Sequence, residues 1–225
     1  MKHPSYLLAS LCLLSLSACT SVTIDEYQRA ETNLASGDRI VLLGRRHSPD
    51  YETEPDLINC VGKVISANQS GISVIPEKQF VDELYPWFEP RMAPMRPKRL
   101  AHLVKKPQVR EKIEELKLRY VIWIDGSTQQ TGSAGSVGCA VGPGGGGCFG
   151  FGTWDDKSDY EAEVWDYQKQ DLVAKVSADA KGTSYMPALV VPIPLLARVQ
   201  SNACKGLGAQ LREIFVPDSS ANAGA

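Results

Sequence analysis

Few side chains in this 225-residue sequence could do chemistry, and each set lacks part of what its chemistry needs. A glycine-rich run, residues 142–147, offers backbone amides of the kind that cradle a phosphate. A phosphate loop ends in Gly-Lys-Ser/Thr, which places an ammonium and a magnesium-bound hydroxyl, whereas this run ends in Cys148-Phe149. Nucleotide binding is therefore not expected.

The histidines offer little for metal or hydrolytic chemistry. Neither His47 nor His102 lies at zinc-ligand spacing from a second histidine or from a Cys-x-x-Cys pair. His47 stands close in sequence to Ser48 and Asp50, the residue types of a hydrolase triad. No Gly-x-Ser-x-Gly elbow accompanies them, so surface histidines are the favoured interpretation.

Three carboxylates, Asp155, Asp156 and Asp159, follow Trp154 and could supply oxygen ligands to calcium. Their spacing is not that of a calcium-binding loop, and we interpret them as a solvated entrance to a strand. The sequence therefore predicts no metal, no cofactor and no catalytic residues.

The amino-terminal residues have the order of a secretory signal. Lys2 precedes a short apolar run, Tyr6 to Leu16, which is too short to span a bilayer as a helix. The last four residues of this region, Leu16-Ser17-Ala18-Cys19, resemble the bacterial lipobox. The resemblance implies a signal peptide over residues 1–18 and lipid attached to the thiol of Cys19.

Lipid on Cys19 would place the chain on a membrane, because two or three acyl chains hold a protein stably. Lipoproteins kept in the inner membrane commonly carry aspartate after the cysteine, and Thr20 stands there in this chain. The periplasmic face of the outer membrane is the expected location. Loss of residues 1–18 removes Lys2 and no acid, which changes the net charge from −2 to about −3, so no nucleic-acid partner is expected.

Cysteine usage agrees with export to an oxidising compartment. Cys12 leaves with the signal peptide, and four cysteines then remain besides the lipidated one: Cys60, Cys139, Cys148 and Cys204. Two disulfides are favoured over buried free thiols, although three pairings are open. Cys139 and Cys148 flank a glycine-rich turn and are paired locally. Cys60 and Cys204 then pair by elimination, joining an early helix to the last one.

Three aromatic residues, Phe149, Phe151 and Trp154, follow the glycine-rich run. A loop held by a disulfide would present them close together, and exposed aromatic side chains are common anchors for a partner. The alternative is that they fold back onto the core. We take the loop from Cys139 to Trp154 as the candidate partner contact.

The apolar patterns predict alternating strands and helices. Expected strands are 39–44, 72–75 and 120–124 and a hairpin of 160–166 with 172–180; expected helices begin at Pro55 and Pro107 and extend over 80–88 and 195–214. Residues 89–99 and 186–194 are proline-rich connections. Residues 19–37 are interpreted as a lipidated tether, 127–152 as a glycine-rich flexible loop unless a disulfide restrains it, and 217–225 as a disordered tail.

These elements predict a single α/β (α+β) domain over residues 38–216, with a mixed sheet of about five strands packed with helices. The layout resembles the amino-terminal domain of TolB and the curli-secretion lipoproteins. The resemblance rests on the strand Arg39 to Gly44, the helix at Glu111 to Leu118 that leads into Arg119 to Gly126, and the hairpin headed by Val164-Trp165-Asp166. Curli-secretion proteins insert long alternating hairpins into the membrane, and residues 127–152 supply no such alternating run, so pore formation is not implied.

The function expected from the sequence is a lipid-anchored, non-catalytic binding or envelope-assembly module whose partner is another envelope protein. Two alternatives stay open, a subunit of a secretion apparatus and an envelope hydrolase. A pocket with converging titratable groups would favour the hydrolase, and a ring-shaped oligomer would favour the secretion subunit.

Overall fold

A computed structural model describes residues 20–46, 52–67, 70–89, 93–94 and 97–216 of the chain. The expected signal peptide, the lipidation site Cys19 and the carboxyl-terminal tail from residue 217 lie outside the described residues. The three residues considered for a hydrolase triad also lie outside the described residues: His47, Ser48 and Asp50.

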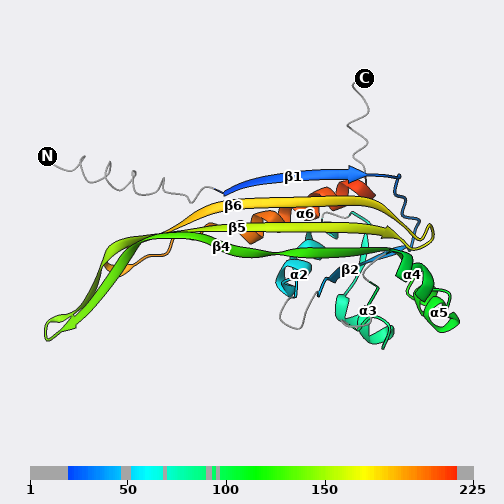
Figure 1. Cartoon of the computed structure of the whole chain (residues 1–225), viewed down its shortest axis with the longest axis horizontal. Coiled ribbons are helices and arrows are strands. Elements are labelled where there is room, and N and C mark those ends of the chain that lie inside the picture. The colour runs from blue at the N-terminus through cyan, green and yellow to red at the C-terminus, as the bar shows by residue number, and fades with distance from the viewer. Residues whose placement is uncertain (1–19, 47–51, 68–69, 90–92, 95–96, 217–225) are drawn as a thin grey trace, which may run out of the picture. The chain divides into compact units, whose positions relative to one another are not determined.

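The chain has an α+β fold, as predicted, with a mixed sheet of six strands instead of about five (Figure 1). The strands lie in the order β1-β6-β5-β4-β2-β3. Their bounds are β1 Thr20–Gln28, β2 Arg39–Gly44, β3 Ser73–Ile75, β4 Leu118–Gly142, β5 Gly145–Asp166 and β6 Asp171–Pro192. The helices are α2 Pro55–Ile65, α3 Glu77–Glu83, α4 Pro97–Leu103, α5 Pro107–Glu115 and α6 Val199–Phe215.

The described chain forms two compact units that share strands β4, β5 and β6. Unit 1 comprises residues 20–21, 128–157 and 180–199, and unit 2 comprises the described residues of 22–127, 158–179 and 200–216. Unit 1 is built almost entirely from strands, whereas unit 2 contains every helix among the described residues except the first residue of α6.

The sheet core of unit 2 is built on β2. Residues 40–43 are almost fully buried, as a continuous apolar run predicts for a strand covered on both faces. Strand β2 pairs in parallel with β3 on one side and with β4 on the other, and Leu43 lies opposite Trp123. The carboxyl ends of β2 and β3 therefore lie at one edge of this sheet, whereas β4 continues beyond its pairing with β2, which ends at Ile124.

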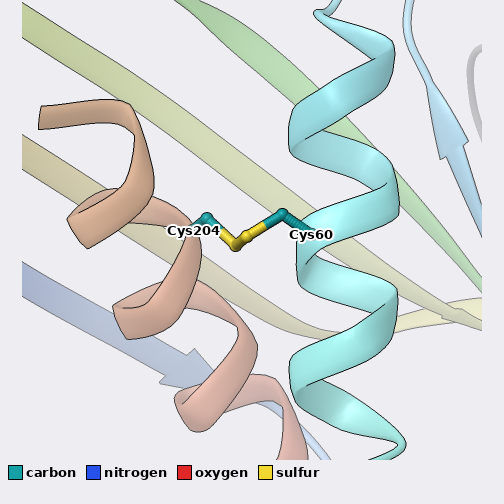
Figure 2. Close-up of a disulfide and its surroundings, with 2 residues drawn as sticks. All are labelled: Cys60 and Cys204. Carbon is teal, nitrogen blue, oxygen red and sulfur yellow. A yellow bond between two sulfur atoms is a disulfide. The ribbon is translucent and has the colours of Figure 1, made fainter. Parts of the chain in front are cut away.

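Helices α2 and α6 lie side by side, joined by the disulfide between Cys60 and Cys204 (Figure 2). The two Cα atoms are 6.2 Å apart. A Cβ atom at Gly208 would lie 2.7 Å from Val64 Cβ, so the two helices can approach this closely only because residue 208 is glycine. The pairing favoured from the sequence is present, and it ties the first long helix of unit 2 to its last.

The structure corrects the interpretation of residues 20–37 as a tether, because strand β1 occupies Thr20–Gln28. Its apolar residues Val22 and Ile24 alternate with polar ones and lie against α6, where a Cβ at Gly206 would come within 2.7 Å of Ile24 Cδ1. An edge strand with two inward apolar residues gives only a weak alternating pattern, which is why the sequence did not reveal it.

The glycine-rich segment 127–152 is not a flexible loop. It forms the paired ends of β4 and β5, joined by Pro143 and Gly144 alone. Gly135 and Gly150 have φ of 80° and 142°, and a Cβ at these positions would lie 2.1 Å from Phe151 O and 2.3 Å from Ser136 O. Here glycine permits the close approach of two strands, so composition alone gave the wrong prediction.

The proline-rich connections are shorter than expected. Strand β6 extends through residues 186–192. The chain then turns back, so that Tyr185 and Leu195 exchange two backbone hydrogen bonds of 2.9 and 2.7 Å. The expected loop 89–99 ends at Pro97, which starts α4, and the expected helix over 80–88 is instead α3, ending at Glu83. Proline is compatible with a helix start and with a strand that lacks one donor.

Candidate functional site

The end of the β4–β5 hairpin in unit 1 is fixed by a disulfide. Cys139 of β4 and Cys148 of β5 are bonded, with Cα atoms 4.0 Å apart, and the connection at Pro143 and Gly144 lies between them. This is the local pairing predicted from the sequence. It closes the hairpin covalently on the side of its turn.

Strand β6 lies beside this end of the hairpin. A Cβ at Gly146 of β5 would lie 3.3 Å from Val141 Cγ2 of β4, and one at Gly147 would lie 3.8 Å from Val190 Cα of β6. Residues near 141, 147 and 190 therefore meet although they are far apart in the sequence. Three strands together form this part of unit 1.

The side chains around this meeting point are apolar and exposed. Twelve large hydrophobic side chains are exposed among the described residues, and eight of them belong to unit 1. We call these eight the apolar surface: Val141, Phe149, Phe151, Leu189, Val190, Val191, Ile193 and Leu196. Val141 is 91% exposed, and Phe149 and Leu189 are each 76% exposed. Single exposed apolar residues are ordinary, whereas contiguous exposed apolar patches are typical of interaction surfaces.

The three aromatic residues singled out from the sequence do not form one cluster. Phe149 and Phe151 are exposed on β5, and the Phe151 ring centroid lies 6.2 Å from that of Tyr185 on β6. Trp154 is half-buried, and the two-residue period of a strand separates it from the face of the other two. Phe149 and Phe151 belong to the apolar surface, and Trp154 does not.

Sequence reasoning missed the part of the apolar surface on β6. Residues Leu189, Val190 and Val191 fall in the segment interpreted as a connection, where the flanking prolines outweighed the apolar run. Val190 is β-branched and yet has a φ of 89°, in the left-handed region. Such a conformation costs about 1–3 kcal/mol, and strained residues concentrate at functional surfaces. The apolar run itself was the signal that could have revealed this surface.

The aspartates considered for calcium bond to hydroxyl groups. In unit 1, Asp155 Oδ1 accepts from Thr183 Oγ1 at 2.6 Å and Asp156 Oδ2 accepts from Ser184 Oγ at 3.3 Å. Asp159 belongs to unit 2. Within the part of the chain that the structure describes, no three His, Cys, Asp or Glu side chains are placed to hold a metal ion.

A search for similar proteins found no matching family model and no matching curated protein. Matching solved structures include the PelC dodecamer from Paraburkholderia phytofirmans, at 13% identity and a TM-score of 0.44, covering 86% of this chain and 97% of the PelC chain. A point variant of the same dodecamer matches at 12% identity and a TM-score of 0.44, covering 86% and 98%. Within the described residues, no helix is both long and apolar enough to cross a membrane.

Proposed function

We propose that the chain is a non-catalytic binding module, lipidated at Cys19 on the periplasmic face of the outer membrane, and that it binds another envelope protein through its apolar surface. The observation that carries this proposal is the concentration of exposed apolar side chains in unit 1. Their burial against a partner would release free energy of about 25 cal/mol for each Å² of apolar area.

The covalent closure of the hairpin supports binding by this surface. The strands are paired, and the Cys139–Cys148 disulfide lies beside Phe149 in sequence. A surface held in one conformation loses less conformational entropy when it binds, so more of the burial energy remains as affinity. A mobile glycine-rich loop would lose much of that energy on ordering.

The position of β1 supports a short connection between lipid and contact surface. The lipobox residue Cys19 precedes Thr20, the first residue of β1 and a member of unit 1. A Cβ at Gly182 of β6 would lie 3.1 Å from Thr20 Oγ1, so this residue lies against the same strand that carries Leu189 and Val191. Lipid on Cys19 would therefore keep unit 1 close to the membrane, where envelope partners are concentrated.

The anchor is tested by replacing Cys19 with serine. We expect Cys19→Ser to abolish metabolic labelling with a palmitate analogue and to leave uncleaved precursor, because the thiol is the acceptor of the lipid. The matched control is Cys12→Ser, which removes the other cysteine of the signal region and should leave labelling and cleavage intact. Normal labelling of Cys19→Ser would refute lipidation at this position.

The contact is tested by photo-crosslinking in intact cells from residue 149, replaced by a photoreactive phenylalanine analogue. We expect one predominant protein adduct, because Phe149 lies in the apolar surface. The matched control is residue 85, since Tyr85 is a 64% exposed aromatic side chain of unit 2 and should give background only. An equal adduct pattern from both positions would count against the proposal.

A further inference from the structure

Unit 2 contains a cavity of about 320 Å³ that plays no part in the proposed contact. It lies at the carboxyl ends of β2 and β3: Leu43 and Gly44 end β2, and Glu77 begins α3 two residues after β3. Open sheets with parallel strands bind ligands in crevices at this edge. The cavity is at the lower end of the size range of small-molecule sites, which fits a ligand of one ring and a short chain.

Much of the cavity wall is apolar. Six lining residues have apolar side chains, and we call them the apolar wall: Leu43, Pro55, Val81, Phe88, Ala93 and Trp123. A ligand with an apolar body would bury part of its surface against this wall, and that burial is favourable. The shape and composition of the cavity therefore favour a small organic ligand.

The charged residues of the cavity do not balance. Arg46 pairs with Glu52, and Lys78 pairs with Asp82, with Nζ and Oδ2 2.7 Å apart. Glu77 is the remaining charged residue of the wall, and among the described residues it forms no salt bridge. The described wall thus carries one carboxylate more than it has cations, so the ligand with complementary charge is a cation.

One oxygen of the Glu77 carboxyl is held by the backbone, and the other is available. Oε1 accepts the Gly44 N–H at 3.0 Å, which fixes the side chain at the end of β2. Within the described part of the chain, Oε2 accepts no hydrogen bond, and it is not one of the buried side-chain atoms that lack a partner. Oε2 is therefore accessible. Because Glu77 lines the cavity, a ligand bound there can donate a hydrogen bond to this oxygen.

The surroundings of this carboxyl disfavour its charge. Partial burial raises the pKa of Glu77 above its usual value, against the opposing effects of the Gly44 N–H and Arg46. A cation beside Oε2 would offset the lost hydration, because a neighbouring opposite charge favours the ionised form. An ammonium group suits this position, since it carries three hydrogen-bond donors and no acceptor.

We propose that this cavity binds a small organic ammonium ion, whose charged group donates to Glu77 Oε2 and whose apolar body lies against the apolar wall. The cavity and the apolar surface belong to different units, so the proposal does not depend on the proposed function. Failure of one leaves the other standing.

Two probes of the same shape that differ in charge test this site. Phenethylamine carries an ammonium group at neutral pH, and 2-phenylethanol carries a hydroxyl group in its place. Their affinities are measured by ligand-observed NMR on residues 19–225, exported without lipid as Cys19→Ser behind a general secretory signal. We expect phenethylamine to bind about tenfold more tightly, the value of a hydrogen bond to a charged group. Equal affinities, or no binding of phenethylamine, would overturn the proposal.

Replacing Glu77 with glutamine assigns the preference to the carboxyl. In Glu77→Gln the amide oxygen can still accept the Gly44 N–H, but the charge is absent, so the two probes should bind with similar affinity. The matched control is Glu83→Gln, which removes the same charge from the same helix at a residue that does not line the cavity. It should keep the preference. A preference that persists in Glu77→Gln, or that Glu83→Gln removes as well, would contradict the proposal.

A second variant keeps the test decisive if Glu77→Gln does not fold. Val81 lines the cavity from α3, so the larger ring in Val81→Phe should fill part of the space and abolish binding of both probes. All charges of the chain are unchanged in this variant, so a general attraction of phenethylamine to an acidic protein would survive it. Binding of phenethylamine that persists in Val81→Phe would contradict the proposal.

Discussion

Replacing both Cys60 and Cys204 with alanine is expected to lower the free energy of unfolding by about 5 kcal/mol. The disulfide closes a segment of 144 residues, and a cross-link over so long a loop restricts the unfolded chain strongly. Alanine is chosen because Cys204 is buried and a serine hydroxyl there would need a partner. Chemical denaturation of the double variant and of the parent chain measures the difference.

The control for this prediction is the other disulfide. Cys139→Ala with Cys148→Ala opens a loop of nine residues, for which the same relation gives about 2.5 kcal/mol. This loss of stability should be confined to unit 1, and the denaturation midpoint of unit 2 should not change. If removal of the short cross-link destabilised unit 2 as much as removal of the long one, the role given to Cys60–Cys204 would be wrong.

The second large effect is expected at the buried ion pair between Arg119 of β4 and Asp166 of β5. Asp166 is fully buried and Arg119 is 8% exposed. Asp166 Oδ1 also accepts the Lys169 N–H at 2.8 Å, so it fixes the turn between β5 and β6. Arg119→Met should cost about 3–5 kcal/mol, because it leaves a carboxylate buried without its main partner.

A double-mutant cycle separates this pairing from ordinary packing. In Arg119→Met the buried Asp166 carboxylate keeps only the half-exposed Lys169 Nζ, at 3.8 Å, as a charged partner. Adding Asp166→Asn removes this poorly compensated charge while keeping an acceptor for the Lys169 N–H, so it should recover much of the loss measured by denaturation. The solvent-exposed pair Lys78–Asp82 is the matched comparison, and Lys78→Met should leave stability unchanged. Additive losses for Arg119→Met and Asp166→Asn would mean that the two side chains are not coupled.

The strongly patterned elements could be predicted from the sequence. The strand at 39–44 is an unbroken apolar run, and the helices after Pro55 and Pro107 carry buried residues at helical spacing, as in α2 with Leu57, Val61 and Ile65. In each of these elements, the spacing of apolar residues along the chain matches the burial pattern. The local sequence pattern was therefore sufficient to predict them.

Elements that depend on a neighbouring strand could not be predicted in the same way. The edge strand β1 has only Val22 and Ile24 to show its inward face. In the sequence alone, the glycines at 135 and 150 indicate a flexible segment. Their role in the close approach of two strands is visible only in the structure, since it involves backbone atoms more than ten residues away. Both features depend on the register between paired strands, and this register cannot be inferred from a short stretch of consecutive residues.

The same distinction applies to the candidate sites. The local disulfide could be predicted, because two cysteines flank a turn. The apolar surface could be predicted only in its Phe149 and Phe151 part, since Leu189 and Val191 lie on β6, which meets the hairpin beside Gly147 through strand pairing.

The central claim, that unit 1 carries the partner contact, is tested most directly by comparing photo-crosslinking yields across exposed apolar positions of both units. Residues 141, 149 and 189 represent the apolar surface, and residues 27 and 85 represent exposed aromatic positions of unit 2. We predict that the three positions of unit 1 capture the same envelope protein and that the two of unit 2 give background only. Capture of that protein with equal yield from residues 27 and 85, or capture of nothing from residues 141, 149 and 189, would contradict the claim.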